Sequence, residues 1–320
     1  MLGLGDPPLS MAHPTIEYLF RPSRTYHRFG NRIEYNAYSM RSESFAPTKP
    51  NASQLRVMLL GDSVINGGNL TDQAELVSTR LKRMLEKRLD RDVVVGNISA
   101  GSWGPGNLKA YVEQFGVFEA DLAVLVLNSK DWTDVRTFEP IVGHHPGFPR
   151  ASPTFAAIEG YNRYFRRYAK GRAGLRVPRV SLDLTRAGNG PRHVAYPAKA
   201  EGERPANAGE PLRGLMRMIQ QREVPLMLVQ HPDRQEITGR WFEGHARIAE
   251  VARQLNVPRL QVKAAFAQAM QNGPSPYRDH IHPNAVGHRV LAEALLPAIL
   301  ERIETRGTRA GKIPQGAGDE

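Results

Sequence analysis

Short runs of aliphatic residues with almost no polar interruption recur along most of this 320-residue chain, and they constrain its fold more than any other feature. They lie at 55–60, 93–95, 122–127 and 226–229. A strand with one face in water alternates apolar and polar residues, so runs without a polar side are typical of parallel strands covered on both faces. Between or after these runs, apolar residues recur every three to four positions, as in amphipathic helices, at 73–89, 111–118, 241–255 and 285–303. The pattern predicts a three-layer α/β/α fold around a parallel central sheet.

The rest of the chain does not follow this alternation. Residues 1–50 are rich in Pro, Tyr, Phe, Asn and Ser without a regular period, and we expect an extended, loop-rich N-terminal arm. The α/β domain spans 51–306 and is interrupted at 133–208 by a Gly-, Pro- and Arg-rich stretch that is too long for an ordinary connection. We expect this insertion to be a lid or a partner surface, and the Gly-rich tail at 307–320 to be disordered.

The composition excludes several classes of protein. The chain has no cysteine, which excludes disulfides, thiol nucleophiles and iron–sulfur clusters. No window approaches the roughly eighteen consecutive apolar residues of a transmembrane helix, and the N-terminus does not contain a signal-peptide core. We expect a cytoplasmic protein if the chain is complete, and a periplasmic or membrane-anchored one if an N-terminal segment has been removed.

The net charge of +11 is concentrated in the insertion. Residues 161–192 hold nine basic side chains and one acidic side chain, a net charge of +8, interleaved with tyrosine and phenylalanine. This mixture suits an acidic polysaccharide, an anionic membrane surface or nucleic acid, although nucleic acid is not an expected partner. The same spacing fits an amphipathic lid helix with solvated arginines. We take Arg163 and Arg166 as candidate substrate-binding residues.

Polar residues follow the predicted strands at the positions where open parallel sheets bind ligands. Ser63 comes directly after the first run, and Asp279 and His282 precede the last helix. A serine is a strong nucleophile only when a base takes its proton, and a histidine does so best when a carboxylate fixes its tautomer. The groups available to hold a developing oxyanion are the backbone amides of Ser63 and of Gly101 or Ser102, and the side chain of Asn128. These residues predict nucleophilic acyl transfer.

The same residues resemble the sequence blocks of the SGNH or GDSL hydrolases, which contribute a Ser, a Gly, an Asn and an Asp-x-x-His pair in that order. Gly61-Asp62-Ser63 is similar to the first block and Asp279-x-x-His282-Pro283 to the last. The resemblance covers roughly 55–131 and 210–303. It implies a flavodoxin-like fold in which Ser63 attacks an ester, His282 transfers protons and Asp279 orients His282, without a cofactor or a metal.

The two middle blocks depart from the family pattern. In the second, Ser102 stands where the family has Gly, with Gly101 one position earlier. In the third, Lys130 stands at the family's Asn and Asn128 at its Gly. Three arrangements remain open: Asn128 donates to the oxyanion, Lys130 supplies a cationic donor, or the oxyanion hole lacks one donor. We favour Asn128.

Several of these residues also have other interpretations. Ser63 is a residue type that caps helices. Asp279, His280 and His282 are ligand types that suit zinc, although such a set usually needs a further ligand. Candidate substrate contacts at the expected pocket are Asp62, Trp103 and Trp132. The two tryptophans either stack on a sugar face or pack in the core.

The sequence therefore predicts a serine esterase that hydrolyses a short acyl ester. The resemblance implies that this is an O-acetyl ester on a carbohydrate or polysaccharide. Transfer of the acyl group to another sugar remains an alternative within the same chemistry, as does hydrolysis of a phospholipid or thioester. The alternative from a different class is a non-catalytic protein that binds an acidic glycan or RNA through the Arg-rich insertion.

Overall fold

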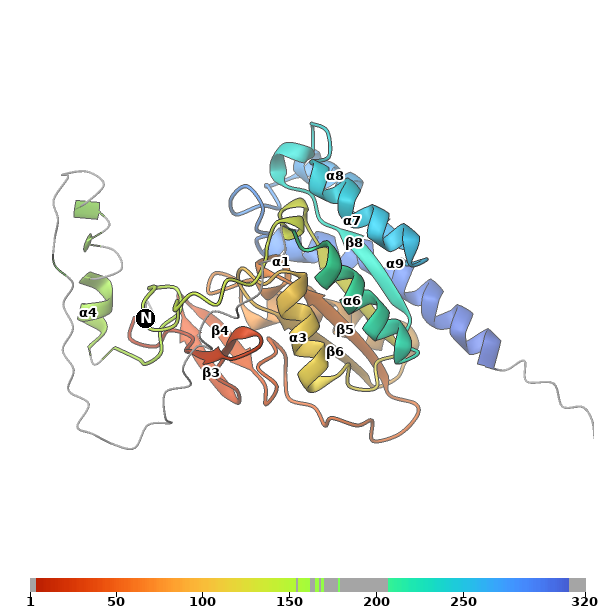
Figure 1. Cartoon of the computed structure of the whole chain (residues 1–320), viewed down its shortest axis with the longest axis horizontal. Helices are drawn as coiled ribbons and strands as arrows, with labels where there is room; N and C mark the ends of the chain where they lie inside the picture. The colour runs from red at the N-terminus through yellow and green to blue at the C-terminus, as the bar shows by residue number, and fades with distance from the viewer. Residues whose placement is uncertain are drawn as a thin grey trace, which may run out of the picture.

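Five strands of the computed structural model form one parallel sheet in the order β6-β5-β7-β8-β9 (Figure 1). They are β5 (Leu55–Gly61), β6 (Val93–Ser99), β7 (Leu122–Leu127), β8 (Leu226–Gln230) and β9 (Arg259–Gln261). The structure describes residues 4–153, 155–161, 165–166, 168–169, 178 and 207–310. Every residue of β5, β6, β7 and β8 is buried, which is why each of these strands contains an apolar run in the sequence.

Helices cover both faces of the sheet, and each face has its own apolar cluster. One cluster joins the sheet to α3 (Pro105–Phe115), α6 (Gly209–Gln221) and α7 (Glu243–Gln254). The other joins it to α2 (Val77–Leu89), α8 (Lys263–Asn272) and α9 (Ala285–Ala310). Figure 1 shows α3 and α6 together over the near face. The predicted three-layer α/β/α fold with a parallel sheet is confirmed.

The strand order places a functional site at one point on the sheet. The chain crosses from β5 to β6 on one side and then returns to β7 on the other side of β5. This is the flavodoxin-like order, and such sheets bind ligands beyond the carboxyl ends of the strands where the direction of winding reverses. The short helix α1 (Ser63–Asn66) begins at that point, directly after β5.

The expectation of an extended, loop-rich N-terminal arm is wrong for residues 10–35. This stretch forms two antiparallel hairpins, β1 (Ser10–His13) with β2 (Glu17–Phe20) and β3 (Arg24–Arg28) with β4 (Asn31–Tyr35). The first hairpin contributes Tyr18 to the apolar cluster on the α3 side of the sheet. The second has a small cluster of its own centred on Ile33, which is fully buried. Figure 1 shows β3 and β4 beside the sheet, not over either face.

The described part of the insertion is attached to this arm. Helix α4 (Ala156–Gly160) carries Glu159, which forms a buried ion pair with Arg28 of β3 and accepts a hydrogen bond from the Gly5 amide at 2.7 Å. Of the predicted insertion at 133–208, the stretch 133–153 and the residues around α4 are described, and most of 162–206 lies outside the described residues.

At the other end of the chain, α9 continues to Ala310. The expected disorder is therefore wrong for 307–310, while the remainder of the tail lies outside the described residues. The described residues also include three short 3₁₀ turns: η1 (Gln73–Glu75), η2 (Ser129–Trp132) and η4 (Arg234–Glu236). Within the described ranges, the helices are too short or too polar for any of them to cross a bilayer.

Candidate active site

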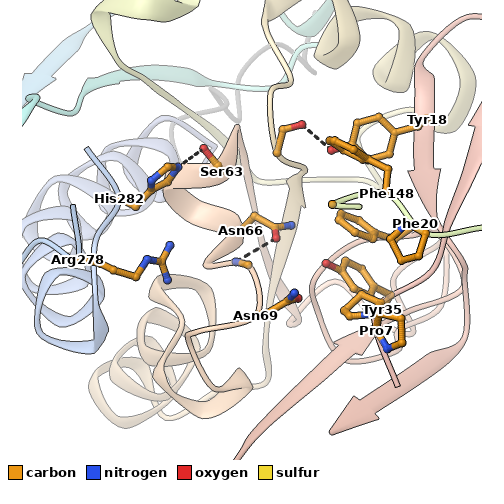
Figure 2. A pocket seen from close by; sticks show the side chains of 15 residues that line it. Pro7, Tyr18, Phe20, Tyr35, Ser63, Asn66, Asn69, Phe148, Arg278 and His282 are labelled. Carbon is orange, nitrogen blue, oxygen red and sulfur yellow. Dashed lines mark hydrogen bonds between the residues drawn. The ribbon is translucent and has the colours of Figure 1, made fainter. Parts of the chain in front are cut away.

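Ser63, His282 and Asp279 meet at the carboxyl end of β5. Nε2 of His282 lies 2.9 Å from Oγ of Ser63, and Nδ1 of His282 lies 2.7 Å from Oδ2 of Asp279. Figure 2 shows the imidazole of His282 directed at the Ser63 hydroxyl. Two residues 219 positions apart in the sequence are thus within proton-transfer distance.

Asp279 is held as a carboxylate by its own loop. Its Oδ1 accepts hydrogen bonds from the backbone amides of Ile281 at 3.0 Å and of His282 at 2.9 Å. Partial burial raises the pKa of Asp279, but these two amides and the His282 ring outweigh that effect and hold the pKa well below its usual range. Because the carboxylate is ionised, Nδ1 of His282 carries the proton and Nε2 is left to accept the proton of Ser63.

A segment after β8 fixes the backbone of this loop. The ring of His231 contacts the carbonyl oxygen of Ile281 through Nε2 at 3.0 Å, and the Arg234 amide donates to the carbonyl of His280 at 2.7 Å. His231 is fully buried, and burial lowers its pKa to about 4, so the ring is neutral and its Nε2–H donates to Ile281. These bonds fix the part of the backbone that places the His282 ring.

Asp62 lies beneath Ser63 and does not contact the cavity, contrary to its expected role as a substrate contact. Its Oδ1 caps α1 by accepting from the Val64 amide at 2.8 Å, and its Oδ2 accepts from the side chain of Asn128 at 3.1 Å. Burial raises the pKa of Asp62. Burial also raises the pKa of Asp131 well above its usual range, and the charge of Asp62 raises it further.

Asn128 joins these two acids, and its predicted role as an oxyanion donor is therefore wrong. Its Nδ2 donates to Oδ2 of Asp62 and, at 2.8 Å, to Oδ2 of Asp131. A primary amide has two hydrogens, so both are engaged with carboxyl groups. The sequence places Asn128 at the correct edge of the sheet but does not show that two buried acids bind its side chain.

Lys130 and Ser102 do not reach the cavity either. Lys130 forms an ion pair at 3.4 Å with Asp233, and its side chain is 51% exposed. Ser102 is exposed with a φ of 58°, and its neighbour Gly101 is the residue of this turn that lines the cavity beside Ser63. The hydroxyl of Tyr18 holds the turn by donating to the Gly101 carbonyl.

The expected aromatic and basic substrate contacts that the structure describes do not line the cavity. Trp103 is 1% exposed within the core, so it packs there and does not stack on a ligand. Trp132 is partly buried against the same cluster, and Arg166 is half-buried, and neither lines the cavity. Arg163 lies outside the described residues.

A cavity of about 210 Å³ opens in front of Ser63 and His282 (Figure 2). Its far wall is aromatic, from two side chains of the first hairpin, one of the second and one of the loop after η2: Tyr18, Phe20, Tyr35 and Phe148. Arg278 lies on the near side, in the position before Asp279. Sequence reasoning missed all five residues. The one available signal was an arginine directly adjacent to the Asp-x-x-His pair.

The zinc interpretation finds no support in this loop. Nδ1 of His280 lies 4.0 Å from Oδ1 of Asp279, and Asp279 is already bonded to His282 through its other oxygen. Over the part of the chain that the structure describes, no three His, Asp or Glu side chains group closely enough to hold a metal ion.

Comparison with known proteins identifies the class. A parallel sheet with a Ser-His-Asp constellation at its carboxyl edge defines a serine hydrolase-type site on a flavodoxin-like fold. The model of the GDSL-like lipase/acylhydrolase family matches residues 59–290, so the chain belongs to this family. The predicted family is confirmed, and the protein is an enzyme that hydrolyses ester bonds. No curated protein matches the chain.

Several solved structures are similar to the chain at low identity. One is LAE5, an α/β hydrolase from the metagenome of Lake Arreo, Spain, with 17% identity, a TM-score of 0.41, and coverage of 76% of this chain and 94% of that one. Another is a mutant of Axe2, an acetylxylan esterase from Geobacillus stearothermophilus, with 14% identity, a TM-score of 0.44, and coverage of 78% and 94%. A third is the esterase EstA from Pseudoalteromonas sp., with 12% identity, a TM-score of 0.43, and coverage of 78% and 98%.

Proposed function

We propose that the protein is a serine esterase that hydrolyses short acyl esters through Ser63, His282 and Asp279. The observation that carries the proposal is the pair of contacts made by the His282 ring, 2.9 Å to the Ser63 hydroxyl and 2.7 Å to the Asp279 carboxylate. This is the arrangement in which a neutral imidazole accepts the serine proton while a carboxylate stabilises the imidazolium that forms.

The reaction follows from these contacts in two steps. Ser63 Oγ attacks the carbonyl carbon of the ester as its proton passes to His282, and His282 then gives that proton to the leaving alcohol. Water repeats the sequence on the acyl-enzyme: His282 takes its proton, the hydroxide attacks the acyl carbonyl, and Ser63 recovers its proton. No cofactor enters either step as proposed.

The oxyanion hole in this proposal consists of backbone amides. Ser63 begins α1 and Gly101 lines the cavity beside it, so their amides are the candidate donors at the reacting carbonyl. The amide hydrogens of Asn128 are bound to Asp62 and Asp131. Of the three arrangements open at the sequence level, we therefore propose the one in which the hole lacks the side-chain donor.

The dimensions and lining of the cavity support a small acyl group on a ring-shaped alcohol. About 210 Å³ must hold the reacting part of both halves of the ester, which leaves room for a short acyl chain such as acetyl. Phe20 and Phe148 are half-buried and present aromatic surface to the cavity. Aromatic side chains offer an apolar face on which the apolar face of a sugar can stack. We propose an O-acetylated carbohydrate as the substrate class.

A covalent probe and a substrate series test the proposal. A fluorophosphonate should label the wild-type chain and the Ser53→Ala control, which removes an exposed serine, but not Ser63→Ala. Hydrolysis of p-nitrophenyl esters should fall as the chain lengthens from acetate to octanoate. Labelling that persists in Ser63→Ala would show that Ser63 is not the nucleophile. A preference for octanoate would show that the substrate does not carry a short acyl group.

A further inference from the structure

One cation, Arg278, faces the cavity without a carboxylate in ion-pair contact among the described residues. Among the described residues that line the cavity, none is acidic, and Arg278 carries the one permanent charge. Its guanidinium is half-buried and donates from Nη1 to the carbonyl of Gly67 at 3.4 Å. No described carboxylate lies within ion-pair distance of it: its neighbour Asp279 pairs with His282 and acts on Arg278 only from farther away.

This arrangement is electrostatically incomplete. A charge withdrawn from water is costly unless it is paired, and the planar guanidinium is best satisfied by a carboxylate or phosphate that it can grip with two donors. The protein supplies one long hydrogen bond to a neutral carbonyl. The remaining donors of Arg278 are therefore available to an anionic group on a molecule in the cavity.

The position of Arg278 relative to Ser63 limits where the anionic group of a ligand can bind. Ser63 begins α1, and Gly67, whose carbonyl Arg278 contacts, is the residue that ends it. The backbones of Ser63 and Gly67 are therefore about one helical turn apart, about 6 Å of rise along the helix axis. Because Ser63 and Arg278 line the same cavity, an ester at Ser63 and an anion at Arg278 can belong to the same sugar unit.

The opposite wall favours a ring over an acyl chain. Phe20 stacks on Tyr35 with ring centroids 4.2 Å apart, and Phe148 packs edge-on against Tyr18 at 4.8 Å. Because both tyrosines are almost fully buried, they hold the two phenylalanine rings in place. Figure 2 shows this aromatic wall across the cavity from Arg278. A ligand between them has an apolar face on one side and a negative charge on the other.

We propose that the substrate is an O-acylated acidic sugar, whose carboxylate binds Arg278 while its ring lies against Phe20 and Phe148. This inference rests on the proposed esterase function and names the alcohol half of its substrate. It assigns the recognition of charge to Arg278 at the cavity and not to the Arg-rich insertion.

A matched pair of substrates tests the inference without any variant. The probes are the methyl glycosides of glucuronic acid and of glucose, each carrying one O-acetyl group on the same hydroxyl. A hydrogen-bonded ion pair at a half-buried site should raise kcat/KM for the acidic ester over the neutral one by about tenfold to a hundredfold. Equal kcat/KM values for the two esters would overturn the inference.

Variants then locate the source of the preference. Arg278→Gln should abolish the ratio of acidic to neutral kcat/KM and Arg278→Lys should restore part of it, whereas Arg289→Gln, at an exposed site on α9, should leave it unchanged. Phe148→Ala should lower kcat/KM for both sugar esters, and Phe155→Ala, at a side chain 53% exposed, should not. A ratio that survives Arg278→Gln would overturn the assignment of the cation.

Three further outcomes separate this inference from the esterase function. If the wild-type protein hydrolyses p-nitrophenyl acetate in a Ser63-dependent way but does not distinguish the two sugar esters, the esterase function stands and the acidic sugar is wrong. If micellar lysophosphatidic acid is hydrolysed with a higher kcat/KM than the acidic sugar ester, the anion that Arg278 binds is a lipid phosphate, and the acidic sugar is wrong. If Ser63→Ala retains full activity on every probe, the proposed esterase mechanism itself fails.

Discussion

The hydrolase core is built on fully buried strands, whereas the strands of the N-terminal hairpins are only partly buried. The core lies within residues 59–290, which the family model matches, and it supplies Ser63 and His282. The hairpins at 10–35 lie outside that match and supply most of the aromatic wall. In our proposals, the shared core therefore carries the chemistry and the added hairpins, with Arg278, select the substrate. The predictions below test whether these two contributions are separable.

The largest expected effect is a loss of catalytic rate without a loss of stability, caused by removal of the nucleophile. Ser63→Ala should lower kcat for p-nitrophenyl acetate by about 10⁴-fold to 10⁶-fold, because the imidazole then has no nucleophile to activate. The hairpins and the sheet should be unaffected, so the melting temperature should match that of the wild type. Residual activity above one per cent of wild type, measured with a folded variant, would contradict the role of Ser63.

Asp279→Asn should produce the next largest loss, about 10³-fold to 10⁴-fold in kcat. The amide can still accept from the Ile281 and His282 amides through its oxygen, but its nitrogen then faces Nδ1 of His282 and favours the wrong tautomer. Steady-state kinetics with p-nitrophenyl acetate measures this effect. The Asp233→Asn variant, whose acid pairs with Lys130 away from the cavity, is the control, and an equal loss there would contradict a specific role for Asp279.

The α/β core could be predicted from the sequence because each of its strands is recognisable from its own few residues. In β5 and β7 every residue is buried, and apart from Arg56 and Gly61 of β5 every one is aliphatic, so each strand is recognisable from its own sequence. Ser63, Asp279 and His282 could be predicted for a related reason, since each directly adjoins such an element. The hairpins carry no comparable signal. In β3 the two buried residues are Tyr26 and Arg28, and Arg28 is buried because Glu159 of the insertion pairs with it.

The predictions about the site that are wrong concern residues whose side-chain orientation is decided by tertiary contacts. The sequence predicts the correct edge of the sheet for Asn128. The orientation of its side chain, however, is determined by two buried acids, Asp131 three residues away and Asp62, which is far away in the sequence. For Trp103 the sequence leaves open a pocket or a core position because the residue follows a strand, and the structure shows that it packs in the core. Position along the chain predicts which edge of the sheet a residue occupies, and tertiary contacts decide whether it reaches the cavity.

The hairpins should be the weaker half of the molecule. Ile33 sits in a cluster with two buried tyrosines, whereas Leu125 of β7 belongs to the much larger cluster beneath α3 and α6. Each truncation, Ile33→Ala or Leu125→Ala, removes a fully buried aliphatic group and should cost about 2 to 5 kcal/mol. In Ile33→Ala the loss should stay local, so hydrogen exchange should accelerate at 24–35 but not in β5. Acceleration of β5 to the same extent would show that hairpins and core unfold as one unit.

Mild acid should provide the smallest and most selective test, because the fully buried titratable histidines of the described residues belong to the core and not to the hairpins. His288 of α9 is fully buried, and its Nδ1 accepts from the Val77 amide at 3.3 Å. Burial, and then the charge of Arg278, lowers its pKa to about 3.

Between that value and about 6.5, the unfolded chain binds a proton at His288 that the folded chain does not. The folded state therefore loses stability at this residue as the pH falls from 7 to 5, by about 2 kcal/mol. His288→Gln removes the titrating group, so the difference in free energy of unfolding between wild type and variant should narrow by about that amount over this range. Denaturant titrations at the two pH values measure it, with His27→Gln, an exposed histidine of β3, as the control. A difference that stays constant for His288→Gln, or narrows equally for His27→Gln, would show that the acid sensitivity is not located in the buried core.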